Sequence, residues 1–176
     1  MKQVRMAAAL LAVVSMAGGM LRAQAPAAPA PNPLEKLAWL EGKWIASGAV
    51  PGSDAVVVRE ANYGWGDTRK TLRFWSYVTP PGGQRQPYVD GFYVWDPTDK
   101  KIRFYYVDPG GFYEGEVKIE GNTYEHIFTG KSNRDGRIAK WRYTLTDAGS
   151  GSMPIRIYAD KEGAWQEFVF LTYRKQ

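Results

Sequence analysis

The 176-residue sequence predicts an all-β fold, a single closed antiparallel up-and-down barrel of about ten strands with one short N-terminal helix. Past residue 43, runs of β-branched and aromatic residues alternate with clusters of Gly, Pro, Asn and Asp, which is the pattern of strands separated by turns. The connections are short and no second helical segment interrupts them. Neighbouring strands are therefore expected to pair in chain order, and closure of the sheet removes both of its edges.

Residues 1–25 have the organisation of a secretory signal peptide. Lys2 and Arg5 precede an apolar run over 6–20, and residues 23–25 read Ala-Gln-Ala, the small-x-small pattern of a signal-peptidase site. We therefore expect cleavage after this site and export to the periplasm or the medium as a soluble protein. The apolar run is shorter than the roughly 20 residues that a transmembrane helix needs, so no membrane span is expected.

The sequence past the cleavage site divides into a linker and one domain. Residues 26–33 are mostly Ala and Pro and form an extended linker, so the folded domain is expected over 34–176. The absence of cysteine excludes disulfides and thiolate chemistry. Removal of the signal peptide takes three of the 23 Lys and Arg residues and leaves 20 basic against 18 acidic residues. This balance argues against nucleic acid as the partner.

The expected elements are bounded by turn-forming residues. A helix is expected over 34–40, because Leu34, Leu37 and Leu40 recur at helical spacing before Gly42. Nine breaks containing Gly, Pro, Asn or Asp separate the strands that follow. The expected strands cover 44–50, 54–63, 70–79, 88–96, 101–107, 112–120, 122–129, 137–147, 153–159 and 164–174.

Alternation along the strands does not identify the inward face. In 101–107, Phe104 and Tyr106 share one face, while Arg103 and Tyr105 share the other. Aromatic side chains thus occur on both faces. This pattern favours a mixed, partly polar interior, as a binding cavity requires, over a solid aliphatic core.

Two short motifs resemble those of a known superfamily. Residues 39–44 read Trp-Leu-Glu-Gly-Lys-Trp, and residues 93–97 read Tyr-Val-Trp-Asp-Pro. Together with the number of strands, they resemble lipocalin-like barrels of the calycin superfamily, including its fatty-acid-binding and nitrobindin-like branches, and exported bacterial proteins of unknown role. The resemblance implies that Trp44 packs at the closed end of the barrel beneath Arg174, a structural contact worth about 0.5–2 kcal/mol.

The single histidine departs from the pattern of the nitrobindin-like branch, which binds haem through a His near the C-terminal end of the barrel. Here the histidine is His126, in the strand expected over 122–129. We therefore expect no cofactor, with haem as the alternative, and interpret His126 as a strand residue hydrogen-bonded to a neighbour. Glu125 points to the opposite face of the strand, so the two residues do not chelate one ion and no metal site is expected.

No group of residues forms a catalytic motif. A single histidine allows at most one Ser-His triad, and Ser47, Ser76 and Ser132 lack the context of a nucleophile elbow. Glu114 and Glu116 share a face of one strand, as acid/base pairs do, but that face is most simply solvated. The sequence therefore favours binding over catalysis.

Aromatic side chains in the central strands suit the walls of a pocket for a flat or amphipathic small molecule, although aromatics also favour strands and fill barrels. An arginine among them, including Arg142, would anchor a carboxylate or would lie outside over a ring. The predicted ligand-binding residues are Arg73, Trp75, Tyr77, Tyr93, Trp95, Arg103, Tyr105, Tyr124, His126, Trp141 and Tyr143.

The leading hypothesis is an exported protein that holds a small hydrophobic or amphipathic ligand inside a barrel. The second is a cofactor-free isomerase or cyclase, in which His126, or a Tyr paired with an inward carboxylate such as Asp90, acts as acid or base. The third is an interaction domain that binds an envelope protein through exposed aromatics. One fold carries unrelated functions, so the site must decide among them.

Overall fold

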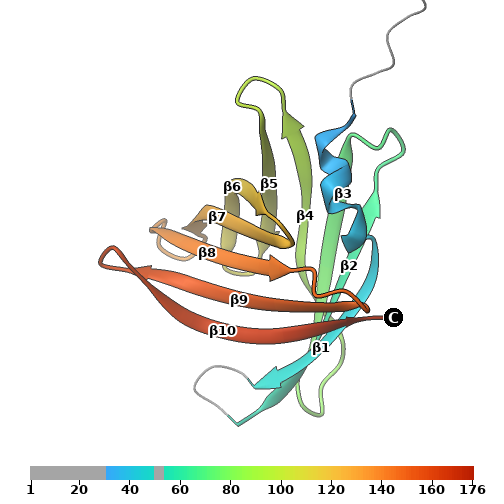
Figure 1. Ribbon diagram of the computed structural model, residues 1–176. Helices are drawn as coiled ribbons and strands as arrows, with labels where there is room; N and C mark the ends of the chain where they lie inside the picture. The colour runs from blue at the N-terminus through green and yellow to red at the C-terminus, as the bar shows by residue number, and fades with distance from the viewer. Residues whose placement is uncertain (1–30, 50–53) are drawn as a thin grey trace, which may run out of the picture. The chain divides into compact units, whose positions relative to one another are not determined.

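The computed structural model describes residues 31–49 and 54–176, so the expected signal peptide lies outside the described residues. Ten strands form one closed antiparallel barrel, in which consecutive strands pair and the last strand returns to the first (Figure 1). This confirms the expected fold class. No helix among the described residues is long and apolar enough to cross a membrane.

One short helix and ten strands make up the described chain. They are the 3₁₀-helix η1 (Pro33–Leu40), β1 (Gly42–Ala49), β2 (Val56–Trp65), β3 (Thr71–Thr79), β4 (Gln86–Asp96), β5 (Lys101–Asp108), β6 (Gly111–Glu120), β7 (Thr123–Ser132), β8 (Ile138–Thr146), β9 (Ser152–Lys161) and β10 (Ala164–Lys175).

The strand bounds differ from expectation at the end of β7, which continues to Ser132, and at β2, which continues past the expected end at residue 63. Gly64 and Trp65 keep their pairing with β3, so the turn is shorter than the sequence predicts. The backbone N–H of Gly66 donates to the carbonyl of Thr71 at 3.0 Å and closes the turn. Arg69 adopts a φ of 52° there, a left-handed conformation more usual for Gly or Asn.

Strand pairing settles which residues face inward. Tyr93 on β4 pairs with Phe104 on β5, and both side chains are almost fully buried. The residues between such positions, for example Phe92 and Val107, are exposed. Because strand residues alternate between faces, this register assigns every strand position to the interior or to the outer surface.

Helix η1 packs one apolar face against the end of the barrel, beside β3 and β4 (Figure 1). Leu34, Leu37 and Leu40 are fully buried. A 3₁₀-helix has three residues per turn, so residues three apart lie on one face. The side chain of Asn32 caps the helix and accepts a hydrogen bond from the Leu34 backbone N–H at 3.1 Å. The helix therefore seals this end, which we call the capped end.

Hydrogen bonds fix η1 to the barrel. The indole Nε1 of Trp44 donates to the carbonyl of Leu40 at 2.6 Å, and the hydroxyl of Tyr124 donates to the carbonyl of Lys36 at 3.1 Å. The first bond satisfies a carbonyl of the last turn, which the short helix leaves without a partner. The strands and the helix thus form one hydrogen-bonded unit at the capped end.

The cation over Trp44 is Lys175 in place of the expected Arg174. Trp44 is buried, and the ammonium of Lys175 lies 5.3 Å from the centre of its ring. In the β1–β10 register Lys175 pairs with Trp44, whereas Arg174 pairs with Ile45, whose side chain faces outward. A cation thus lies over the Trp44 ring as expected, but it belongs to Lys175, the residue next to Arg174.

The buried face of η1 predicts a difference between two adjacent substitutions. Leu37→Ala leaves a cavity beneath the helix and is expected to lower the free energy of unfolding by about 2–5 kcal/mol. Lys36→Ala removes an exposed side chain and keeps the backbone carbonyl, so its expected effect is within about 0.5 kcal/mol. Urea denaturation of both variants measures the difference; equal losses would mean that η1 does not seal the barrel.

Candidate functional site

The inner face of the barrel carries a group of side chains with polar tips. They alternate along the strands with outward residues, and the register places them among the buried apolar side chains. This inner polar group consists of Arg59, Tyr63, Tyr93, Tyr106, Tyr113, His126, Tyr143 and Tyr173.

Aromatic rings fill the middle of the interior. Tyr106 and Tyr113 stack with ring centres 4.4 Å apart and an interplanar angle of 6°. The ring centre of Phe104 lies 5.4 Å from that of Phe128 and 5.0 Å from that of His126, and both are edge contacts. Offset and edge contacts of this kind add to the burial of apolar area. We call this set of rings the aromatic layer.

His126 lies within the aromatic layer and is fully buried. Its Nδ1 lies 3.3 Å from the carbonyl oxygen of Tyr124, and its Nε2 lies 3.0 Å from the hydroxyl of Tyr93. A carbonyl only accepts, so Nδ1 carries the proton and Nε2 accepts from Tyr93. Both nitrogens are engaged, as the interpretation of His126 as a hydrogen-bonded strand residue expects.

Burial keeps these groups neutral. Desolvation lowers the pKa of His126 to about 4, against hydrogen bonds to the backbone that favour the protonated form. Burial also raises the pKa of Tyr63, Tyr93 and Tyr143 well above the usual range. The interior therefore presents neutral hydroxyl groups around one imidazole.

Arg59 is the charged member of the inner polar group. It lies on β2 and pairs with Ala46 on β1 and Val78 on β3, neither of which offers a polar side chain. Its Nε is buried and has no hydrogen-bond partner among the described residues. A buried donor without a partner is costly, about 1–3 kcal/mol and more for a charged group.

Tyrosine side chains surround Arg59. Burial raises the pKa of Tyr173 to about 12, while the positive charge of Arg59 acts in the opposite direction. Burial likewise raises the pKa of Tyr88, where the charge of Asp108 adds to the effect and that of Arg59 opposes it. Arg59 and its tyrosines form the candidate binding site.

The sequence contains a signal for Arg59 that the list of predicted residues misses. In Val57-x-Arg59-x-Ala61-x-Tyr63 the arginine alternates with apolar residues, whereas the opposite face carries Glu60 and Asn62. The less polar face of a strand faces the interior. This alternation places Arg59 inside.

The predicted residues divide between the two faces of the sheet. Six of them face the interior, namely Tyr93, Trp95, Tyr124, His126, Trp141 and Tyr143, and five lie on the outer face, namely Arg73, Trp75, Tyr77, Arg103 and Tyr105. The outer residues gather at two surface grooves, described next.

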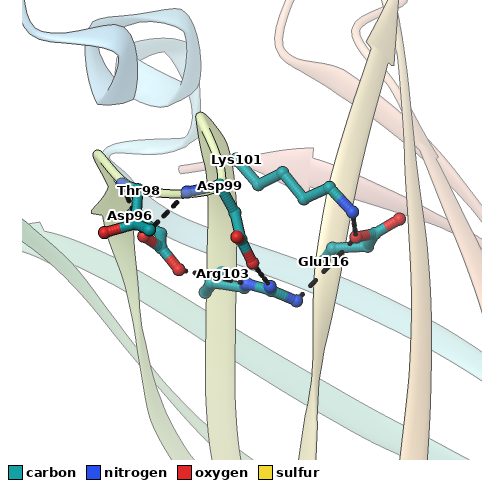
Figure 2. Close-up of polar contacts among 6 residues, drawn as sticks. All are labelled: Asp96, Thr98, Asp99, Lys101, Arg103 and Glu116. Atoms are coloured by element: carbon teal, nitrogen blue, oxygen red, sulfur yellow. Dashed lines mark hydrogen bonds and ion pairs between the residues drawn. The ribbon is translucent and has the colours of Figure 1, made fainter.

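Arg103 is held in a network of carboxylates on the outer face (Figure 2). Its guanidinium forms ion pairs with Asp96 at 3.6 Å and Glu116 at 3.8 Å, and it bonds to Asp99. Hydrogen bonds from the Asp99 and Thr98 backbone lower the pKa of Asp96, with Arg103 adding to the effect. The donors of Arg103 are thus engaged within the protein, which ties the β4–β5 turn to β6.

Arg103 and Tyr105 border a groove of about 500 Å³ that runs over β5 to β8. Glu114, Glu116 and Lys140 also line it, so its walls carry both signs of charge. Glu114 and Glu116 lie on the outer face, where the sequence places a solvated polar surface. The three carboxylates around Arg103 form no metal-binding group, and no such group occurs elsewhere in residues 31–49 and 54–176.

Arg73 and Trp75 border a second groove, of about 360 Å³, over β3 and β4. The guanidinium of Arg73 donates two hydrogen bonds to Asp90, at 2.8 and 3.2 Å, and lies 5.5 Å from the centre of the Trp75 ring. Asp90 therefore faces outward and is paired, so it does not supply the inward carboxylate that the enzyme hypothesis names.

Tyr77 and Arg142 are also covered on the outer face. The guanidinium of Arg85 stacks 3.2 Å over the ring of Tyr77 and donates to Glu60 at 2.6 Å, and this bond lowers the pKa of Glu60 to about 2. Arg142 lies 4.2 Å over the ring of Tyr158. Arg142 also pairs with Glu125 at 3.8 Å, although its buried Nε has no hydrogen-bond partner among the described residues. Arg73, Arg103 and Arg142 thus cover rings or pair with carboxylates, the alternative that the sequence left open.

The buried imidazole predicts a pH dependence of stability. The pKa of His126 is about 4 in the folded state and 6.5 in the unfolded chain, so the unfolded chain binds the extra proton between these values. The free energy of unfolding is expected to be highest above pH 6.5 and to fall by about 3 kcal/mol as the pH drops to 4.

Urea denaturation across this pH range tests the expectation, with His126→Gln as the variant that lacks the titrating group. The variant curve should be flatter between pH 6.5 and 4. Because the chain has one histidine, NMR of its imidazole reports the same pKa directly, and a value near 6.5 would contradict the burial argument.

Comparison with known proteins assigns no function to this site. The chain matches no protein-family model, and no curated protein is significantly similar to it.

Proposed function

We propose that this chain is an exported, lipocalin-like binding protein that holds a small amphipathic molecule with an anionic group inside its barrel. Arg59 is the anchor for the anionic group, and the surrounding tyrosines form the walls. The location, periplasm or medium, follows from the signal peptide expected over residues 1–25. The proposal assigns the barrel to the calycin superfamily and needs no metal or cofactor.

The observation that carries the proposal is the buried Nε of Arg59 without a partner. The outer arginines Arg73 and Arg103 bond to carboxylates. The outer Arg142 also has a buried Nε without a hydrogen-bond partner, but its guanidinium pairs with Glu125 at 3.8 Å, whereas Arg59 forms no ion pair among the described residues. A carboxylate or phosphate ligand would supply the missing acceptor and would form charge-assisted hydrogen bonds. This accounts for a cation among tyrosine and aliphatic side chains.

The number of strands supports the same conclusion. An eight-stranded barrel is just wide enough for side chains to fill its interior, and the diameter grows with the number of strands. The ten strands of this barrel therefore enclose a wider interior. The aromatic layer occupies the middle, and the small side chain of Ala46, next to Arg59, leaves that region less crowded.

A second candidate function has support on the outer face. Phe92, Val107 and Phe112 lie on adjacent strands, and their side chains are 43%, 50% and 46% exposed. Such neighbouring apolar side chains are typical of interaction sites. They favour an interaction with an envelope protein as the alternative. The enzyme hypothesis lacks comparable support, because both nitrogens of His126 are engaged.

Calorimetric titration of the purified protein tests the proposal. The panel contains long-chain fatty acids, the alcohols of the same chain length, and haem. We expect the acids to bind more tightly than the alcohols. Arg59→Gln should weaken binding of the acids by about 10- to 100-fold, the loss of charge-assisted hydrogen bonds worth about 1.5–3 kcal/mol.

Arg73→Gln is the matched control, because it removes an arginine of the neighbouring strand whose side chain faces outward and pairs with Asp90. Its affinity for the acids should equal that of the unaltered chain. Equal losses of affinity in the two variants, or no binding of any member of the panel, would refute the proposal. Either result would favour the interaction with an envelope protein through the exposed aromatic surface.

A further inference from the structure

The barrel is incompletely closed between its first and last strands. β1 and β10 pair at Trp44–Lys175 and Ile45–Arg174, next to the capped end, and their pairing stops there. Each of the other nine strand boundaries carries at least five residue pairs in the described chain. This boundary is therefore the weakest part of the ring.

Beyond the two pairs, residues 46–49 of β1 lie next to residues 170–173 of β10 without a backbone ladder among the described residues. We call this boundary the seam. If the register continued, Ser47 would face Thr172 and Gly48 would face Leu171. Backbone groups along the seam lack the strand partner that holds the other boundaries together.

The side chain of Leu171 packs across the seam. Leu171 is only 7% exposed and lies against Gly48, where an added Cβ would come within 2.2 Å of its Cδ2 atom. A side chain at position 48 would have to displace this methyl group of Leu171. The seam is thus closed by packing of Leu171 and not by hydrogen bonds.

Arg59 lies directly behind the seam. Arg59 on β2 pairs with Ala46 on β1, and Val57, also on β2, pairs with Gly48 on β1. The inward side chains of β1 at the seam are therefore the small ones of Ala46 and Gly48. If the register continued, Tyr173 would face Ala46, so a molecule that passes Leu171 would meet the side chains of Tyr173 and Arg59.

The energetics also favour passage at this place. The capped end is sealed by η1 and its hydrogen bonds. Elsewhere around the ring, separation of two strands breaks a ladder of backbone hydrogen bonds. At the seam no such ladder is present, and a rotamer change of Leu171 removes its contact with Gly48. Such changes are fast compared with the motion of whole elements.

We propose that the seam is the entrance of the binding site and that Leu171 is its gate. This inference rests on the proposed function, because it assigns a route to the ligand that Arg59 holds. Gly48 is the positioning residue that lets Leu171 close the seam, and Ala46 keeps the path to Arg59 open.

A disulfide across the seam tests the route, and the chain has no cysteine of its own. The variant S47C/T172C places one thiol on each side, on the outer face. We expect oxidation to slow both association and dissociation of a fatty-acid probe by at least about tenfold, with little change in Kd, because the gate acts on rates. Reduction should restore the rates.

The control is E114C/T129C, which places a disulfide between residues that already pair across the complete β6–β7 boundary. Its oxidation should leave both rates unchanged. Unchanged rates in the oxidised S47C/T172C variant would overturn the proposal. So would failure of its thiols to join while those of the control join, because Leu171 could not then bridge the seam.

Leu171→Ala gives the opposite perturbation. Removal of the gate should speed both rates by about tenfold at a similar Kd. Loss of affinity without a change in the association rate would mean that Leu171 only packs the wall, and this result would also overturn the proposal.

Amide hydrogen exchange separates failure of this inference from failure of the proposed function. Amides of residues 46–49 that point away from β2 should exchange faster than those in the β6–β7 ladder, with or without a ligand. If no probe binds, the proposed function fails. The exchange pattern still tests whether the β1–β10 boundary is open. Equal protection at both boundaries would show that the seam is shut.

Discussion

Closure of the ring at Trp44 and Lys175 is the constraint on which the rest of the structure depends. Lys175 pairs with Trp44, and its ammonium lies over the indole and donates to the carbonyl of Trp39 at 3.2 Å. The Trp44 indole holds the end of η1 through Leu40. The same two residues therefore join the first strand, the last strand and the helix.

The closed barrel has an outer and an inner face, and the arginines on these two faces differ. On the outer face, Arg73 and Arg103 are paired with carboxylates and remain partly hydrated, so each contributes little to stability. Inside, Arg59 is partly desolvated and has a donor without a partner. Retaining such a group lowers stability. The proposed function gives a physical reason for keeping it, because the same unpaired donor would favour an anionic ligand in the interior.

The sequence predicts the strands well because each break is marked by its own turn chemistry, which is local. The inward face is harder to predict. Tyr105 and Tyr106 are both aromatic and adjacent, so hydrophobic alternation does not distinguish them, and only pairing with β4 places Tyr106 inside. Arg73 and Arg103 pair with carboxylates on the outer face. These carboxylates are distant in sequence or lie in a turn, so hydrophobic periodicity does not reveal the pairs. The exchange of Arg174 for Lys175 has the same origin, since one residue of register decides the face.

The seam connects stability with access. A complete β1–β10 ladder would add backbone hydrogen bonds and would leave no lateral route to Arg59. Small residues at Ala46 and Gly48 forgo packing that larger side chains would provide. Both features weaken the barrel at one boundary, and that boundary adjoins the unpaired cation of the interior. Incomplete closure, small side chains and a buried arginine thus have a common explanation in a barrel that must admit and release a ligand without unfolding.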